Sequence, residues 1–261
     1  MRLYTMLSGM LVMASLNVFA QSNYKESSNS FALYTQTGDL KNLENAKKFI
    51  DAAYKTRRDS SNTRVNVLRS MIYSSMAYGD SLRTIKNPKD PIDITYDALN
   101  KIKERELTEY ASEMKYVKQN LAAAHIYNAN KALQKQNYAG AYESYLKVKN
   151  LEISNYDVTY NLALLAVQTE QYDAAASYYD QILKSDNATA ENYLELVNVY
   201  RKTSNKQRAL NTLQTARTKF PESKDVLMNL VQEFALNNEY KAIVPIIDEA
   251  IKYEPENIEL N

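Results

Sequence analysis

Apolar and polar positions follow a helical spacing over most of the chain, and in its second half this pattern repeats every 34 residues. The Tyr-x-x-Ala sequence that begins at Tyr138 recurs at Tyr172, and the position of its alanine recurs at Ala209 and Ile243. In each repeat, positions 4, 7, 8 and 11 share one stripe of a first helix, and positions 17, 20, 24 and 27 share one stripe of a second. A single helix pair cannot bury its apolar stripe alone, so neighbouring pairs must stack. The pattern therefore predicts a row of stacked helix pairs.

The period divides the second half of the chain into four predicted units: 122–155, 156–189, 190–223 and 224–257. Small or apolar residues are expected where two helix backbones approach, and larger apolar residues fill the seam between them. Residues that cap helices stand at the junctions, in Ser154-Asn155, Asp186-Asn187, Pro221-Glu222-Ser223 and Pro255-Glu256-Asn257. The repeated positions are Ala129, Ala163, Val197 and Val231 (position 8), Ala141, Ala175, Ala209 and Ile243 (position 20), Tyr145, Tyr179, Leu213 and Ile247 (position 24), and Val148, Ile182, Ala216 and Ala250 (position 27).

These residues closely resemble the tetratricopeptide repeat (TPR) family. The resemblance implies an all-α fold, a right-handed α-solenoid of antiparallel helix pairs known as the TPR superhelix. The chain departs from the family in having no Trp at position 4 and no Gly at position 8, and Ile153 stands where the family usually has Pro. Position 4 is instead occupied by His125, Thr159, Tyr193 and Leu227.

Residues 21–121 are expected to form divergent helical repeats. The segments 43–53 and 94–102 both resemble a second helix of a unit, with Ala46 and Ala98 at the position of its small residue. Insertions break the period between these segments and the four regular units. The first insertion includes a polar link from Gly79 to Pro91.

The first twenty residues are typical of an export signal. Arg2 precedes a mostly apolar run, and Val18 and Ala20 place small residues before a predicted cut between Ala20 and Gln21. An uncleaved membrane anchor is the alternative, but the run is short for a spanning helix and contains polar residues. We therefore expect an exported protein, periplasmic or associated with the outer membrane. Tyr-rich, cysteine-free exported chains of this layout resemble TPR proteins of Bacteroidota.

Composition narrows the classes of function further. The chain has no cysteine, so neither a disulfide nor a lipid attached through cysteine is expected. Its formal net charge is +1 over 261 residues, which is a poor match for nucleic acid, because nucleic-acid binding depends on many phosphate contacts. With 4 Gly and 5 Pro, the chain favours helices joined by short links over a many-stranded sheet.

Candidate chemistry is sparse. The glycines outside the signal are isolated, so no glycine-rich phosphate cradle and no nucleotide cofactor is expected. One histidine, His125, stands at an inward-facing position, where a packed core side chain is favoured over a general base. Glu104, Glu106, Glu109 and Glu113 alternate with basic residues, which is typical of a solvated helix face. We expect neither a metal site nor an enzyme, although sequence alone leaves open a glycosidase with two converging carboxylates.

The family resemblance implies a binding surface on the first helices, which line a concave groove in TPR proteins. Position 5 and position 9 face the ligand there, together with positions 2, 12 and 13. Only Arg201 and Lys202 are basic among these positions, so the basic clamp of chaperone-binding members is absent, and an amphipathic helix or extended partner segment is expected. The candidate binding residues are Ile126, Asn130, Tyr160, Leu164, Leu194, Asn198, Arg201, Met228 and Gln232.

Two functions remain open from the sequence. The first is a non-catalytic protein–protein interaction scaffold in the cell envelope, and the second is an accessory glycan- or peptide-binding protein in nutrient uptake. We also expect an exposed apolar flank on the last unit, because only residues 258–261 follow it. That flank predicts self-association or a longer partner at the C-terminal end.

Overall fold

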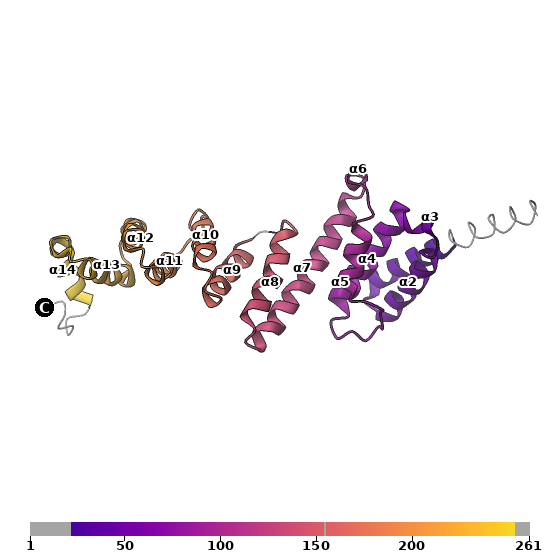
Figure 1. Ribbon diagram of the computed structural model, residues 1–261, viewed down its shortest axis with the longest axis horizontal. Coiled ribbons are helices and arrows are strands. Elements are labelled where there is room, and N and C mark those ends of the chain that lie inside the picture. Colours follow the sequence, from indigo (N-terminus) through magenta and orange to yellow (C-terminus); the bar gives the residue numbers. More distant parts are fainter. Residues whose placement is uncertain (1–21, 154, 254–261) are drawn as a thin grey trace, which may run out of the picture. The chain divides into compact units, whose positions relative to one another are not determined.

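The structure is a computed structural model that describes residues 22–153 and 155–253. Within these ranges the chain forms helices and turns and no strand. The predicted cleavage site, Ser154 and the last predicted junction lie outside the described residues. After a helix over residues 22–37, the elements, coloured along the sequence in Figure 1, are α2 (Leu40–Ala53), α3 (Arg57–Ser60), α4 (Thr63–Gly79), α5 (Pro91–Leu99), α6 (Glu104–Leu107), α7 (Ala111–Gln134), α8 (Tyr138–Asn150), α9 (Tyr156–Gln168), α10 (Tyr172–Ile182), α11 (Ala190–Lys202), α12 (Lys206–Lys219), α13 (Lys224–Leu236) and α14 (Tyr240–Tyr253).

The described residues form two compact units, one up to Asn128 and one from Ala129 onward. In the first unit, α4 is buried on nearly all sides and contacts both α2 and α5. Its small and apolar residues are not confined to one stripe, which is the pattern of a central helix. Ile72, Tyr73 and Met76 are fully buried there against Leu43 and Ile50 of α2.

The loop that follows α4 is held by one buried carboxylate. Asp80 accepts hydrogen bonds from the backbone N–H groups of Thr84 and Ile85, both at 2.8 Å, and from the Thr84 hydroxyl at 2.7 Å. Burial alone would raise the pKa of Asp80, but these hydrogen bonds and Arg83 outweigh it and lower that pKa. The polar link predicted between Gly79 and Pro91 is therefore an ordered loop.

In the second unit, consecutive helices pack as pairs. α9 contacts α10, α11 contacts α12, and α13 contacts α14, each across a short turn that makes the pair antiparallel. Contacts of α10 with α11 and of α12 with α13 join each pair to the next. This arrangement confirms the all-α fold class predicted from the sequence and, within the second unit, the predicted stack of antiparallel helix pairs.

Small residues sit where the two helices of a pair approach. Ala163 on α9 and Ala175 on α10 are both fully buried, as are Val197 on α11 and Ala209 on α12. An alanine at these points lets the backbones come close, and larger residues such as Tyr179, 1% exposed, fill the space beside them.

The turn inside each helix pair has the same backbone conformation four times. Gln136, Glu170, Ser204 and Asn238 all have positive φ, at 56°, 58°, 55° and 60°. After each of them a backbone N–H reaches back to a carbonyl of the preceding helix, as in the 2.8 Å bond from Gln171 to Ala166. This is the Schellman geometry that ends a helix, and here it recurs with the sequence period.

Two local features differ from the sequence prediction. Asn155 and Ser223 cap α9 and α13 as expected, but α11 is capped by Thr189, whose hydroxyl accepts from the Asn192 N–H, and not by Asp186 or Asn187. In addition, α7 begins at Ala111, so no helix starts at Ala122. The division into units 122–155 and onward stays a prediction.

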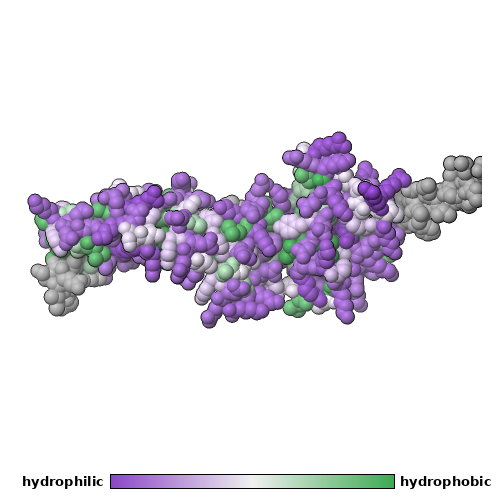
Figure 2. All heavy atoms as spheres, viewed as in Figure 1, coloured by the Kyte–Doolittle hydropathy of each residue, from purple (hydrophilic) through white to green (hydrophobic). Residues whose placement is uncertain are grey.

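Figure 2 shows one face of the molecule, on which polar side chains dominate and apolar ones gather in separate small areas. The most exposed large apolar side chain in the described part of the first unit is Leu82, at 81%. In the second unit, Leu236, Tyr240 and Val244 are 57%, 61% and 70% exposed, and all three lie at α14 or at the end of α13.

Candidate functional site

The residues predicted to bind a partner lie on the first helices of the pairs. Ile126 and Asn130 are on α7, the former in the first compact unit and the latter in the second. The other seven lie on α9, α11 and α13, spaced three or four residues apart within each helix, so each set shares one face. We call the surface formed by these seven the first-helix face; its members are Tyr160, Leu164, Leu194, Asn198, Arg201, Met228 and Gln232.

Exposure separates these residues into two kinds. Asn130, Asn198 and Gln232 are exposed, whereas the predicted apolar residues and Arg201 are half-buried. Leu194 and Met228 each pack on one side against a core cluster of the second unit. The apolar residues therefore have a dual role, supporting the fold and leaving part of their surface open.

Hydrogen bonds join α9 to α11. The Tyr160 hydroxyl donates to Glu195 Oε1 at 2.8 Å, and the Tyr156 hydroxyl donates to Asn192 Oδ1 at 3.1 Å. The rings of Tyr156 and Tyr160 stack one helical turn apart, with centroids 5.7 Å apart and planes inclined by 13°. Asn192 in turn lies 3.4 Å from Glu195 Oε2, so the four side chains form one connected cluster.

Three members of this cluster, Tyr156, Asn192 and Glu195, were not predicted from the sequence. They stand at positions 1, 3 and 6 of the predicted units, outside the positions that face a ligand in the TPR family. One signal was available, because Tyr156 and Tyr160 are spaced to lie on the same helix face.

The cluster holds a carboxylate with little charge compensation. The pKa of Glu195 is raised, first by burial and further by the negative charge of Glu191, while hydrogen bonds from Tyr160 and Asn192 oppose the shift. Burial also raises the pKa of Tyr160, and the hydrogen bond to Glu195 adds to that effect. Burial is the first cause of both pKa shifts, and a nearby carboxylate adds to each.

Between α11 and α13 the polar contacts are of a different kind. Arg201 Nε donates to Glu233 Oε2 at 2.9 Å, and Arg201 Nη1 donates to Asn229 Oδ1 at 3.0 Å. The Glu233 side chain is only 3% exposed, so this is a buried carboxylate neutralised by an arginine from the neighbouring helix. Arg201 was expected to offer a positive charge to a partner, but its guanidinium instead pairs with Glu233 of the same chain.

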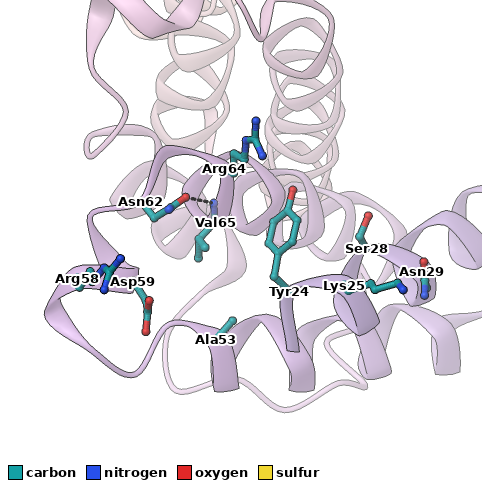
Figure 3. Close-up of a pocket in the computed structure, with 10 residues that line it drawn as sticks. All are labelled: Tyr24, Lys25, Ser28, Asn29, Ala53, Arg58, Asp59, Asn62, Arg64 and Val65. Carbon is teal, nitrogen blue, oxygen red and sulfur yellow. Dashed lines mark hydrogen bonds between the residues drawn. The ribbon is translucent and has the colours of Figure 1, made fainter. Parts of the chain in front are cut away.

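The first unit contains a pocket of about 610 Å³ near its first described helix (Figure 3). Charged residues of both signs line it, with Lys25, Arg58 and Arg64 against Asp59, and its apolar lining is limited to Ala53 and Val65 and to the ring of Tyr24. Small-molecule sites are usually lined mainly by apolar and aromatic residues. This pocket is therefore a weaker candidate than the first-helix face.

His125, considered above as a general base, is a packed side chain. It is 2% exposed, its ring stacks on that of Tyr96, and its Nε2 lies 3.3 Å from the Tyr96 hydroxyl. Among residues 22–153 and 155–253, no group of three or more His, Asp or Glu side chains is placed to hold a metal ion.

No protein-family model matches the sequence, and a search of curated proteins gives no match. Solved structures do resemble the chain. YrrB, described as a TPR protein with an unusual peptide-binding site, has 15% identity and a TM-score of 0.44, over 81% of this chain and 95% of its own. PilW, described as a widely conserved type IV pilus biogenesis factor, has 14% identity and a TM-score of 0.45, over 90% and 96%.

The pilF protein of Pseudomonas aeruginosa has 17% identity and a TM-score of 0.33, over 85% of this chain and 99% of its own. At these identities and TM-scores, the likeness assigns neither a partner nor a function. Separately, none of the helices in the described residues combines the length and apolar character needed to cross a membrane.

Proposed function

We propose that this protein is a non-catalytic protein–protein interaction scaffold that binds a segment of its partner along the first-helix face. The observation that carries this proposal is the open part of Leu164, Leu194 and Met228, which three successive first helices present side by side. Around them, polar side chains are held by hydrogen bonds between helices, so the surface is ordered before a partner arrives. Apolar side chains among fixed polar groups suit an amphipathic helix or an extended segment.

The contacts of the polar groups also favour binding over catalysis. Glu233 is paired with Arg201, and Glu195 accepts hydrogen bonds from Tyr160 and Asn192, so each carboxylate has a structural role. A glycosidase would need two carboxylates facing each other across a substrate cleft. We therefore propose that the chain is not an enzyme.

The site of action belongs to the same proposal. We propose that the chain is exported, cleaved after Ala20, and acts in the periplasm or at the outer membrane. The intact mass of the protein from its native host should correspond to a chain that begins at Gln21. A mass that includes Met1 would contradict export with cleavage.

The binding face has a direct test. Asn198→Arg together with Gln232→Arg adds two long charged side chains at exposed positions of α11 and α13 without touching the core. Partner binding should be lost while the helical circular dichroism signal is unchanged. The matched control is Gln181→Arg with Gln214→Arg, exposed on the second helices α10 and α12, which should bind as the unmodified chain does. Equal partner binding by the unmodified chain and both variants would refute the proposal that the partner binds along the first-helix face.

A second function is favoured by one feature of the same face. The stacked pair Tyr156 and Tyr160 offers aromatic surface on which a sugar ring of a glycan could stack, as expected of an accessory ligand-binding protein in nutrient uptake. Affinity purification from envelope extract and glycan-binding measurements separate the two functions. A co-purifying protein that the Asn198→Arg/Gln232→Arg variant fails to retain supports the scaffold, whereas saturable glycan binding without a protein partner supports the alternative.

We propose one further contact surface, at the last helix pair. Leu236, Tyr240 and Val244 are more than half exposed, which is unusual for three large apolar residues so close together. We propose that a second copy of the chain covers them.

A further inference from the structure

The junction between α9 and α11 carries negative charge that the chain does not neutralise. Asp157 and Glu191 are exposed in the first turns of the two helices, and Glu195 is half-buried one turn beyond Glu191. Carboxylates in a first turn also stabilise a helix through its dipole, which accounts for Asp157 and Glu191 but not for Glu195. Among the described residues, no lysine or arginine forms an ion pair with Glu191 or Glu195.

Basic residues are scarce on this part of the molecule. The sequence of α9 contains none, and α11 has only Arg201 and Lys202, both in its last turn. Arg201 is committed to Glu233 of the next helix. The N-terminal halves of α9 and α11, beside the first-helix face, therefore carry acidic residues and no basic ones.

Aromatic rings lie next to this charge. Tyr156 and Tyr160 stack on each other, and the hydroxyl of Tyr160 binds Glu195 directly. Tyr179 of α10 is also close, since the charges of Glu195 and Glu191 contribute to raising the pKa of its hydroxyl after the larger effect of burial. Aromatic faces beside carboxylates are the surroundings that favour a lysine or arginine side chain, which gains cation–π attraction together with an ion pair.

At the neighbouring junction, between α11 and α13, a basic side chain of the chain itself pairs with a carboxylate. Arg201, at position 12 of α11, reaches across to Asn229 at position 6 of α13 and to Glu233. One repeat earlier, position 12 of α9 is Val167 and position 6 of α11 is Glu195. The carboxylate at the neighbouring junction, Glu233, stands at position 10, where α11 has Val199. The α9–α11 junction thus has a carboxylate at the position of Asn229 and no arginine at the position of Arg201.

We propose that the α9–α11 junction, formed by Tyr156, Tyr160, Glu191 and Glu195, receives a lysine or arginine side chain of the partner. This inference rests on the proposed function and adds the chemistry of the partner: a segment in which a basic residue stands beside apolar residues. The basic residue enters the acidic aromatic junction, and its apolar neighbours contact the open part of Leu164 and Leu194. The ion pair fixes the position of the segment along the face.

A displayed library of short random peptides, selected on the full chain at low ionic strength, is the probe. Selected peptides should carry a lysine or arginine next to apolar residues, and rising salt should weaken their binding because it screens the charges. Glu191→Gln with Glu195→Gln should weaken them by about tenfold or more, the usual scale for losing a charge-assisted hydrogen bond. The matched control, Glu143→Gln with Glu222→Gln, removes two exposed carboxylates elsewhere in the second unit and should leave affinity within about twofold, the scale of a weak surface charge.

A charge reversal at Glu191 tests whether the carboxylates select a basic residue of the partner, because a purely structural role of Glu191 would not change the peptides that are selected. Glu191 is exposed, so Glu191→Lys should fold normally, which circular dichroism checks, and selection on it should no longer enrich basic peptides. One outcome would overturn this inference and leave the proposed function standing: selected peptides do not bind the Asn198→Arg/Gln232→Arg variant, but they show no preference for a basic residue. Peptides that bind this variant as well as they bind the unmodified chain would count against both the inference and the proposed function.

Discussion

Four residues with full side chains adopt a left-handed backbone at the same place in each helix pair: Gln136, Glu170, Ser204 and Asn238. An L-residue there places its Cβ close to a carbonyl oxygen, and asparagine tolerates this best. The fold needs the conformation because it ends the first helix and turns the chain into the second. Each of the first three turns therefore carries backbone strain that a glycine would not.

Replacing one of these residues should stabilise the protein. Glu170→Gly is expected to raise the free energy of unfolding by roughly 0.5–1 kcal/mol, since relief of the left-handed strain exceeds the greater entropy of glycine in the unfolded chain. Urea denaturation of the full chain measures the change. Gln168→Gly, two residues earlier at the end of α9, is the control and should instead cost up to about 1 kcal/mol, because it weakens a helical position. A loss of stability in both variants would argue against strain at the turn.

Glu195 makes the stability of the second unit depend on pH. Its pKa in the folded protein is raised above the unfolded value by burial and by Glu191, and the other groups that face it are Tyr160, Asn192 and Tyr179. A raised carboxyl pKa means that its stabilising contribution is complete below the unfolded pKa and is lost as pH rises through the folded pKa. The ionised carboxylate is thus a cost to the fold at neutral pH.

Glu195→Gln should therefore increase stability at neutral pH, and the gain should disappear at acidic pH below the unfolded pKa. Thermal unfolding of the variant and the unmodified chain across this range measures the difference. Glu143→Gln, at an exposed carboxylate on α8, should show no such pH-dependent gain. If the Glu195→Gln gain were equal at every pH, an effect other than charge burial would be responsible.

At the scale of elements, the closeness of each helix pair depends on small buried residues. Ala141 is fully buried on α8, whereas Ala139, two residues earlier on the same helix, is exposed. Ala141→Leu should overpack the contact and cost roughly 1–3 kcal/mol, while Ala139→Leu should change stability by no more than about 0.5 kcal/mol. Melting temperatures of the two variants provide the comparison. Equal losses would show that the buried face of α8 has been assigned wrongly.

Helix ends show how far element boundaries follow from local sequence. The caps at Asn155 and Ser223 were predicted correctly because a side-chain oxygen next to a helix start is a local signal. Thr189 was missed, since three candidate cap residues stand within four positions and the packing of α11 selects among them. The early start of α7 at Ala111 was missed as well, because the repeat suggested a start that no capping residue marks.

At the scale of the whole molecule, the proposed association through α14 is open to direct measurement. Static light scattering at rising concentration should show a mass above that of one chain, and Val244→Lys should restore the monomer, since it places a charge in the contact. Leu82→Lys, at an 81% exposed apolar residue in the first unit, should leave the association unchanged. A monomer at all concentrations, with the protein well folded, would contradict the proposal, and a complex only with another protein would assign the surface to a longer partner.

The sequence by itself determined the class of fold, because a helical period that recurs every 34 residues is written in local spacing. The buried small residues, such as Ala141, Ala175 and Ala209, follow from the same spacing. Only the tertiary structure decided how the first-helix face is built. Tyr160 meets Glu195, and Arg201 meets Glu233, across residues far apart in the chain, and these pairs form because stacking brings successive first helices side by side. Periodicity specifies which face of a helix is buried, whereas the partner of a polar side chain depends on which neighbouring helix packs against it.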